Sequence, residues 1–436
     1  MPSSRAVNAG VDRGGPGAIS RHRGHPGPIS TSRRGATIAA LALCLAGAPL
    51  PASASAASAS PAAPEAVAAA ASVRQGVTAA TARRSLPALR VRTLVTDLDH
   101  PWDIAFLPSA AMLYTERERG RIWWRGHGGT RHLVVDRPAD LWVSGETGLM
   151  SIAVDDAFAR TRTFWTCQGD NTVGGGHDVR VVRWRLADDA RSARRLGAIV
   201  TGLPATSGRH GGCRLEFGSE GALYVGTGDA ATASTPQDKR SGGGKVLRVV
   251  PATGAGWPTN PFIASADAME RRVFTYGHRN VHGLALRPDG RMWSAEHGPD
   301  RDDEVNLLRS GGNYGWDPDG PGYDESVPMT DFSLPGRQVP ARWSSGYPTL
   351  AVSGATWLTG DRWGGYRGRL VVAALKNSSV RMMRFVGSDF RNAVDPAALD
   401  GTFGRLRTAV VGPRNALYLT TDNGNGTDRI LKVTPR

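Results

Sequence analysis

The sequence has 436 residues, a formal net charge of +14 at pH 7 and 40% hydrophobic residues. This length allows one large domain or two or three smaller ones. Because the lysines and arginines are dispersed rather than gathered into runs, the basic charge does not favour nucleic acid as a partner, and we predict none.

The first 60 residues predict a signal peptide, residues 1–60. Arg33 and Arg34 precede an apolar run over residues 36–50, and small residues typical of a cleavage site follow. The run is shorter than the roughly 20 residues of a membrane span, so we expect export without a stable membrane anchor, to the periplasm or the exterior. Residues 61–88 are rich in alanine and predict a disordered lead-in, and residues 89–436 form the predicted folded domain.

Two cysteines remain in the predicted mature chain, because Cys44 lies in the signal peptide. In an exported protein, Cys167 and Cys213 most simply form a disulfide. Two unpaired buried thiols are the alternative.

Short stretches of alternating apolar and polar residues, separated by Gly, Pro, Asp and Asn, recur after residue 90. Four of these stretches resemble each other closely and begin at Ile104, Leu215, Leu284 and Ala409, and two weaker copies begin at Ser151 and Thr356. One such unit cannot bury both faces of its sheet alone, whereas sheets packed radially around an axis can. We therefore predict an all-β fold, a six-bladed β-propeller with four-stranded blades, in which tryptophans such as Trp102 and Trp316 fill the space between blades.

A histidine and an aspartate flank the third repeat. His210 lies in SGRHGGCRLEF before the predicted inner strand, and Asp229 ends VGTGD after the hairpin. An aspartate that accepts one ring proton of a histidine leaves the other ring nitrogen free as a base. A surface histidine in a glycine-rich loop is the alternative.

Residues 276–306, YGHRNVHGLALRPDGRMWSAEHGPDRDDEVN, surround the fourth repeat with ionisable groups. Arg279 and Asn280 lead into its inner strand, and Gly298 and Pro299 form a turn after its hairpin. Such a turn presents backbone carbonyl oxygens, which are good ligands for calcium. The acids that follow are either further ligands, partners of the arginine, or a solvated turn.

Three more cations interrupt apolar strand patterns late in the chain: Lys376, Arg405 and Arg407. Charged side chains at inward strand positions are costly unless they are paired, and few acids lie beside these three in sequence. We expect that they and Arg279 bind an anionic ligand at the mouth of the channel. Salt bridges between blades are the alternative.

Together, these motifs resemble the soluble pyrroloquinoline quinone (PQQ)-dependent glucose/aldose sugar dehydrogenase family of six-bladed propellers. The strongest pieces are YGHRNVHGLAL, EHGPDRDDEVNLLRSGGNYGWD and HGGCRLEFGSEGALYVGTGD, and the likeness covers about four fifths of the chain. The resemblance implies PQQ and calcium as cofactors. It implies His210 as the general base and Asp229 as its orienting carboxylate.

The resemblance also implies which residues bind the cofactors. Arg279 and Asn280 match residues near the reacting carbonyl of PQQ, and Gly298 and Pro299 match the turn that binds calcium. In the family, four residues hold the carboxylates of PQQ, and the matching positions here are Thr349, Lys376, Arg405 and Arg407.

The activity implied is that of an exported quinoprotein that oxidises an aldose at its anomeric hydroxyl to the lactone. No C-x-x-C-H haem-attachment motif occurs, so an external electron acceptor is required. Glu146, Arg209 and Tyr347 stand on the possible substrate side, and the first two depart from the family pattern. Tyr347 is expected either to stack on a sugar or to pack within the protein.

Two other functions stay open. A calcium-dependent propeller lactonase would surround calcium with side-chain acids and would lack the cluster of Lys376, Arg405 and Arg407. A non-catalytic extracellular propeller that binds glycans or proteins would need neither His210 nor the basic cluster.

Overall fold

The computed structural model describes residues 85–318 and 322–436. The predicted signal peptide and most of the predicted lead-in, residues 61–88, lie outside the described residues, and those assignments stay predictions. No helix within the described ranges is long and apolar enough to cross a membrane.

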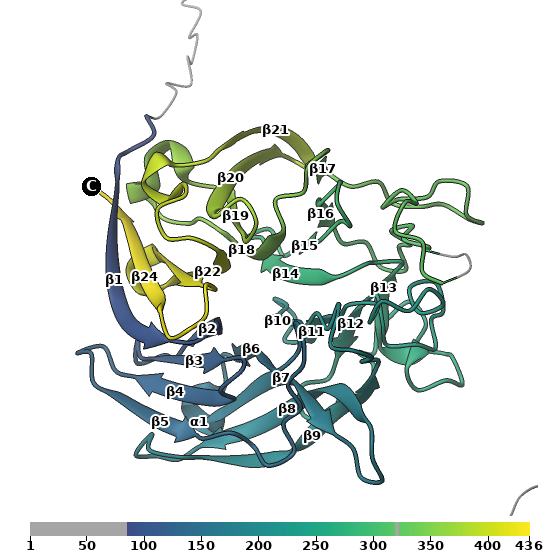
Figure 1. Cartoon of the computed structure of the whole chain (residues 1–436), viewed down its shortest axis with the longest axis horizontal. Helices are drawn as coiled ribbons and strands as arrows, with labels where there is room; N and C mark the ends of the chain where they lie inside the picture. Colours follow the sequence, from purple (N-terminus) through teal and green to yellow (C-terminus); the bar gives the residue numbers. More distant parts are fainter. Residues whose placement is uncertain (1–84, 319–321) are drawn as a thin grey trace, which may run out of the picture. The chain divides into compact units, whose positions relative to one another are not determined.

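Six antiparallel four-stranded sheets surround a common axis, which confirms the predicted six-bladed β-propeller (Figure 1). The first two blades contain β2 (Pro101–Phe106), β3 (Met112–Glu116), β4 (Arg121–Arg125), β5 (Arg131–Val135), β6 (Leu149–Val154), β7 (Thr163–Asn171), β8 (His177–Leu186) and β9 (Ala193–Leu203). The third and fourth contain β10 (Arg214–Phe217), β11 (Leu223–Gly226), β12 (Lys245–Val249), β13 (Val273–Tyr276), β14 (Val281–Leu286), β15 (Met292–Glu296), β16 (Glu304–Leu307) and β17 (Trp343–Ser344).

The fifth blade and the sixth blade complete the ring. They contain β18 (Val352–Trp357), β19 (Leu370–Ala374), β20 (Ser379–Val386), β21 (Asp389–Val394), β22 (Leu406–Gly412), β23 (Ala416–Thr421), β24 (Asp428–Pro435) and β1 (Leu89–Leu98). The described helices are short: α1 (Phe158–Thr161) and 3-10 helices at Glu270–Arg272, Asp361–Tyr366, Ala397–Leu399 and Pro413–Asn415.

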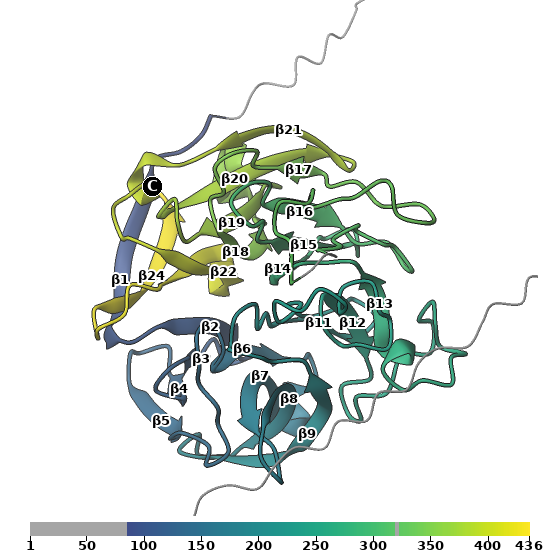
Figure 2. The same ribbon diagram turned by 45° about the vertical axis from the view of Figure 1, so that its right-hand side comes forward.

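The ring closes because the first strand of the domain joins the last blade. β1 pairs antiparallel with β24, from Leu89 opposite Pro435 to Leu98 opposite Asp428. Figure 2 shows the two strands side by side at the edge of the sixth blade. This pairing covers an edge of β24 that would otherwise expose unpaired backbone groups.

The six predicted repeats all coincide with the innermost strands, β2, β6, β10, β14, β18 and β22, which contact one another around the axis. Apolar side chains fill the space between neighbouring blades. Between the second and third blades, for example, Trp165 and Val179 share a buried cluster with Val225 and Leu247. The repeats therefore predicted the inner strands, and these strands are buried along nearly their whole length because neighbouring blades cover both faces of each sheet.

A buried ion pair links the inner strands at the axis. The Asp103 Oδ1 atom of β2 lies 2.6 Å from the Arg214 Nη1 atom of β10, and both residues are less than 5% exposed. The Ser151 hydroxyl of β6 donates to Asp103, and Arg214 donates to the His282 carbonyl of β14 and to the Thr408 hydroxyl of β22. Side chains or backbone of five blades thus share one polar network.

Trp102 contributes to the axis as well as to packing between blades. The Arg214 guanidinium lies 4.2 Å from the centroid of its ring, which is fully buried. A cation over the face of an indole is favourable, and more so when both groups are desolvated. The predicted role of Trp102 as filler between blades is therefore incomplete.

The two cysteines form the predicted disulfide, and the alternative of free thiols is wrong. Cys167 of β7 and Cys213 just before β10 join the second and third blades, with their Cα atoms 6.1 Å apart. Both are fully buried. Because Cys213 follows His210 by three residues, the bridge also restrains the loop that carries this histidine.

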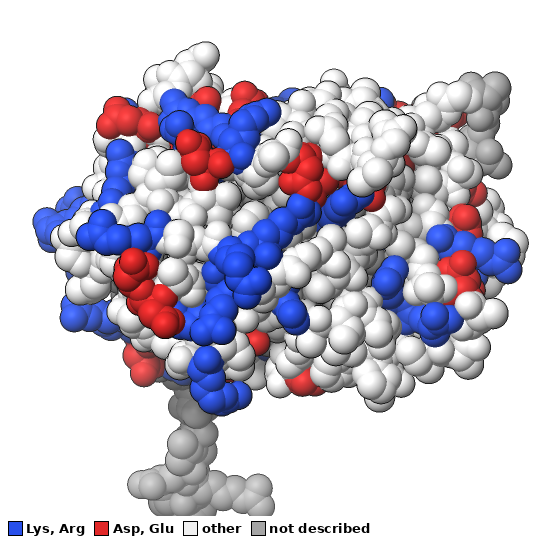
Figure 3. Space-filling model, turned by 90° about the horizontal axis from the view of Figure 1, so that it is seen from below, with Lys and Arg blue, Asp and Glu red and all other residues white. Residues whose placement is uncertain are grey.

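Charged side chains cover the outer side of the propeller. In the view of Figure 3, a band of lysines and arginines runs beside scattered acidic residues. Several of these surface charges are paired, as in Arg121 with Asp136. Exposed pairs of this kind contribute little to stability, in contrast to the buried axial pair, whose disruption would leave an uncompensated buried charge.

We predict that Asp103→Asn lowers the free energy of unfolding by about 3–5 kcal/mol, because it leaves the buried Arg214 without its counter-ion. Denaturant unfolding followed by tryptophan fluorescence measures this change. The matched control is Asp136→Asn, which removes the carboxylate of an exposed pair. Equal losses in the two variants would contradict the role given to the axial pair.

Candidate functional site

His210 and Asp229, which flank the third blade's first hairpin in sequence, meet in the structure. His210 Nδ1 lies 2.8 Å from Asp229 Oδ1, and the two residues are 3% and 0% exposed. Because a carboxylate only accepts, Nδ1 carries the proton of the neutral ring and Nε2 is the free basic nitrogen. His210 is thus a buried, oriented histidine rather than a surface residue of a glycine-rich loop.

Asp229 is held by more partners than sequence reasoning found. Its Oδ2 atom accepts hydrogen bonds from Trp316 Nε1 and the Tyr323 hydroxyl, both at 2.7 Å, and its Oδ1 atom accepts one from Ala231 N at 2.8 Å. Burial, followed by the Asp229 charge, raises the pKa of Tyr323 well above its usual value, so its hydroxyl stays protonated and can donate. Trp316 therefore orients the carboxylate, and its predicted role as filler between blades is incomplete.

Glu146 lies beside the base. Its Oε2 atom accepts hydrogen bonds from the His210 backbone N at 3.2 Å and from Asn280 Nδ2 at 3.1 Å. Burial alone would raise the pKa of Glu146, but the neighbouring imidazoles of His282 and His297 hold it well below its usual value. An ionised Glu146 thus anchors the loop that carries His210.

Arg279 lies between β13 and β14 and is only 4% exposed. Its Nη1 atom donates to the His297 carbonyl at 3.1 Å, and its Nη2 atom pairs with Glu325 Oε1. The other oxygen of Glu325 pairs with Arg209, whose guanidinium lies 5.6 Å from the centroid of the Tyr323 ring. One carboxylate thus bridges the two arginines, which no feature of the sequence around either arginine predicted.

Arg405 and Arg407 share an acid, so the expectation that they lack one is wrong. Arg407 Nη2 donates to Asp422 Oδ2 at 2.7 Å, and Arg405 Nη2 lies 3.7 Å from the same oxygen. The physical reason is strand register: Leu406 of β22 lies opposite Thr421 of β23, which brings the next residue, Asp422, beside Arg405. Burial alone would raise the pKa of Asp422, but Arg407 and His100 hold it well below its usual value.

Lys376 keeps an unneutralised charge. Its Nζ atom contacts the Thr349 hydroxyl at 3.4 Å, and no carboxylate in the described ranges forms an ion pair with it. Thr349 in turn donates its backbone N–H to the Asp300 carbonyl at 3.0 Å, which joins it to the Gly298–Asp300 turn. Tyr347, two residues earlier, is 79% exposed, so it does not pack within the protein.

The Gly298–Pro299 turn is fixed by a buried aspartate. Asp303 accepts hydrogen bonds from Gly298 N at 3.0 Å and from Leu350 N at 2.7 Å, which ties the turn to the next blade. A Cβ atom on Gly298 would lie 1.9 Å from the Arg301 carbonyl oxygen, so only glycine fits. In the described ranges, His, Cys, Asp and Glu side chains form no group of three that could hold a metal, so a cation here would use backbone oxygens of the turn.

Several buried polar atoms at the centre of the site lack hydrogen-bond partners among the described residues: Arg279 Nε, Arg407 Nε, His282 Nε2 and His297 Nε2. The two imidazole rings stack with centroids 4.2 Å apart. Burial lowers the pKa of His282 to about 4 and lowers that of His297 well below its usual value, so both rings are neutral at pH 7. Unsatisfied buried donors are costly, which makes this region receptive to a ligand rich in acceptors.

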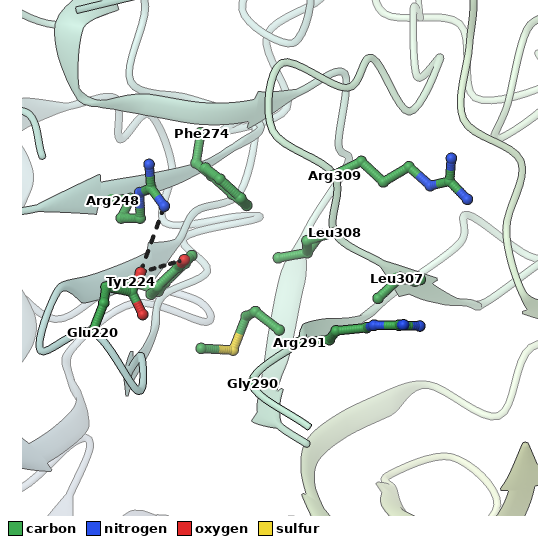
Figure 4. Close-up of a pocket in the computed structure, with 10 residues that line it drawn as sticks. Glu220, Tyr224, Arg248, Phe274, Gly290, Arg291, Leu307, Leu308 and Arg309 are labelled. Carbon is green, nitrogen blue, oxygen red and sulfur yellow. Dashed lines mark hydrogen bonds and ion pairs between the residues drawn. The ribbon is translucent and has the colours of Figure 1, made fainter. Parts of the chain in front are cut away.

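Two cavities lie away from these residues. The pocket in Figure 4, of about 680 Å³, opens between the third and fourth blades, where Arg248 pairs with Glu220 and covers Phe274. A cavity of about 270 Å³ follows the axis and is lined by inner strands of all six blades, including Arg214 and Glu216. None of the residues predicted to carry chemistry lines either cavity.

The comparisons with known proteins cover most of the propeller. The family model described as Glucose / Sorbosone dehydrogenase matches residues 98–432. The chain is 31% identical over 359 residues to Aldose sugar dehydrogenase YliI of Escherichia coli (strain K12), a match that covers 80% of this chain and 93% of the relative.

Solved structures of aldose sugar dehydrogenases are also similar to this chain. The soluble aldose sugar dehydrogenase of Escherichia coli, in its apo form, is 29% identical with a TM-score of 0.70, covering 80% of this chain and 100% of that one. The PQQ-bound form of an aldose sugar dehydrogenase from Streptomyces coelicolor is 27% identical with a TM-score of 0.65, covering 81% of this chain and 100% of that one.

Proposed function

Since the chain belongs to the Glucose / Sorbosone dehydrogenase family, as its motifs predicted, we propose that it oxidises an aldose at the anomeric hydroxyl to the lactone, with PQQ as cofactor. The observation that carries this proposal is the buried His210–Asp229 pair, together with Lys376, which has only a hydroxyl partner among the described residues. A general base, together with cationic side chains whose hydrogen-bond donors lack partners, fits the oxidation of a neutral sugar with an anionic cofactor.

The residues proposed to hold PQQ are Arg279, Asn280, Thr349, Lys376, Arg405 and Arg407. PQQ carries three carboxylates, which fit the unneutralised Lys376 and the unpartnered Nε atoms of Arg279 and Arg407. When bound, PQQ would supply the quinone that takes up the two electrons lost by the sugar carbon, as one hydride. The same cation set disfavours a lactonase, which would need no such anion site.

His210 is proposed to accept the sugar hydroxyl proton at Nε2. Its Nδ1 atom is committed to Asp229, and the resulting imidazolium would be stabilised by that carboxylate. Trp316 and Tyr323 fix the other oxygen of Asp229, so the ring keeps its orientation during proton transfer. General-base catalysis of this kind contributes a factor of about 10²–10⁴ in rate.

Calcium is proposed to bind the carbonyl oxygens of Gly298 and Pro299. Asp303 supports this by holding the turn rigid from inside, which pre-organises the backbone oxygens. A calcium ion there would supply positive charge beside the cofactor. Glu146, Arg209 and Tyr347 remain the proposed substrate side, and the exposed Tyr347 ring offers an apolar surface to a sugar.

Export and an external acceptor complete the proposal. The disulfide between Cys167 and Cys213 supports an oxidising compartment, such as the periplasm or the exterior. The sequence has no C-x-x-C-H motif for a haem of its own, so electrons pass to a separate carrier.

We predict that the purified protein gains aldose-dependent reduction of an electron-accepting dye only when PQQ and calcium are both added. Dye absorbance over a panel of aldoses measures the activity, with PQQ alone and calcium alone as controls. Absence of activity on every sugar would contradict the proposed function.

We predict that His210→Ala lowers kcat about 10²–10⁴-fold while the dissociation constant for PQQ stays within about twofold, because the base acts on the sugar. Steady-state kinetics and a PQQ titration measure the two quantities. His127→Ala, which changes an exposed histidine in a hairpin, is the control. Unchanged turnover in His210→Ala would remove this residue from the mechanism.

We predict that Arg405→Ala weakens PQQ binding about tenfold and changes the KM for sugar less, because it removes a charge-assisted hydrogen bond to the cofactor. Titration with PQQ at fixed calcium measures the first effect. Arg429→Ala changes an exposed arginine of β24 and serves as the control. A larger effect on sugar than on PQQ would assign Arg405 to the substrate instead.

A further inference from the structure

One loop of the fourth blade brings two unassigned side chains to the base and to the arginine of the site. The loop joins β16 to β17 and carries Tyr323 and Glu325. The Tyr323 hydroxyl bonds to Asp229, and Glu325 binds Arg279 through one oxygen and Arg209 through the other. These contacts lie within the site and have no counterpart in the sequence motifs.

Glu325 offers Arg279 the same chemical group that an anionic ligand would bring. Arg279 is almost fully buried, and its remaining partners are the His297 carbonyl and the ring of Trp316 at 5.7 Å. A carboxylate beside a desolvated guanidinium strongly reduces the positive potential that a second anion feels. The Arg279–Glu325 pair and an anionic ligand near Arg279 therefore oppose each other.

Asp422, the acid that pairs with Arg407, is held differently from Glu325. Asp422 is 3% exposed and binds Arg407 at 2.7 Å and His100 Nδ1 at 2.8 Å, so it is a fixed part of the sixth blade. Glu325 has a side chain that is 31% exposed, and it lies on a loop. Its second oxygen stays on the exposed Arg209, which gives the carboxylate a partner after it leaves Arg279.

We propose that Glu325 is a positioning residue that pairs with Arg279 when no anionic ligand is bound and lowers the affinity of the site for PQQ. Binding of the cofactor then requires the Arg279–Glu325 contact to break or to be shared. The inference rests on the proposed function, because it takes PQQ as the anionic ligand. The affinity of the protein for PQQ then depends on the competition between the Glu325 carboxylate and the carboxylates of PQQ for Arg279.

The test is a PQQ titration of the purified full chain and its Glu325→Gln variant by equilibrium dialysis, at fixed calcium and low ionic strength. We expect Glu325→Gln to bind PQQ about tenfold more tightly, because the amide keeps the shape of the side chain and removes its charge. A purely structural role would weaken binding or leave it unchanged. The matched control is Asp395→Asn, which removes the carboxylate of the Arg381–Asp395 pair at the outer strands of the fifth blade.

The outcomes separate this inference from the proposed function. If the unmodified protein binds PQQ and Glu325→Gln binds it no more tightly than Asp395→Asn does, the inference is overturned and the function stands. If the unmodified protein binds no PQQ at all, both are overturned. Glu325→Ala provides a second variant, which is expected to tighten binding as well, and weaker binding with an unchanged circular dichroism spectrum would also overturn the inference.

Discussion

The ion pair between Asp103 and Arg214 is the constraint on which the rest of the domain depends. Burying two charges at the axis is unfavourable unless polar groups surround them, and three further blades supply hydrogen-bond partners to this pair. His282 connects this network to the site, because its carbonyl accepts from Arg214 and its Nδ1 atom accepts from Arg407. Arg407 is therefore joined through His282 to the contacts that hold the ring together.

The site combines a positive charge that is only partly neutralised with a base that is fully oriented. Asp422 and Glu325 each serve two arginines, whereas Lys376 has only a hydroxyl partner. The shared carboxylates offset part of the cost of burying the arginines, and the positive charge that remains can still attract an anion. In contrast, Asp229 uses both oxygens, so the His210 ring has one orientation.

Sequence reasoning predicted the blades and the disulfide because each depends on local pattern. The inner strands recur at similar spacing and most are followed by a short turn, and two cysteines leave one pairing. It also selected His210 and Asp229, since both flank the same hairpin. Sequence reasoning missed Asp422 as the partner of Arg405, because the register between β22 and β23 cannot be predicted from the sequence of either strand alone. It missed Tyr323 and Glu325 because their loop is rich in glycine and proline and has no periodicity to fix where its side chains lie.

The closure of the ring by β1 and β24 has a practical consequence for attaching the protein to other molecules. Arg436 donates its backbone N–H to the Ala88 carbonyl at 2.9 Å, so the start and the end of the described domain meet on the outermost strands of one blade. The chemistry of the site depends instead on loops that enter the innermost strands. A fusion partner or a surface linker joined after Arg436 would thus leave from the periphery of the propeller, away from its innermost strands.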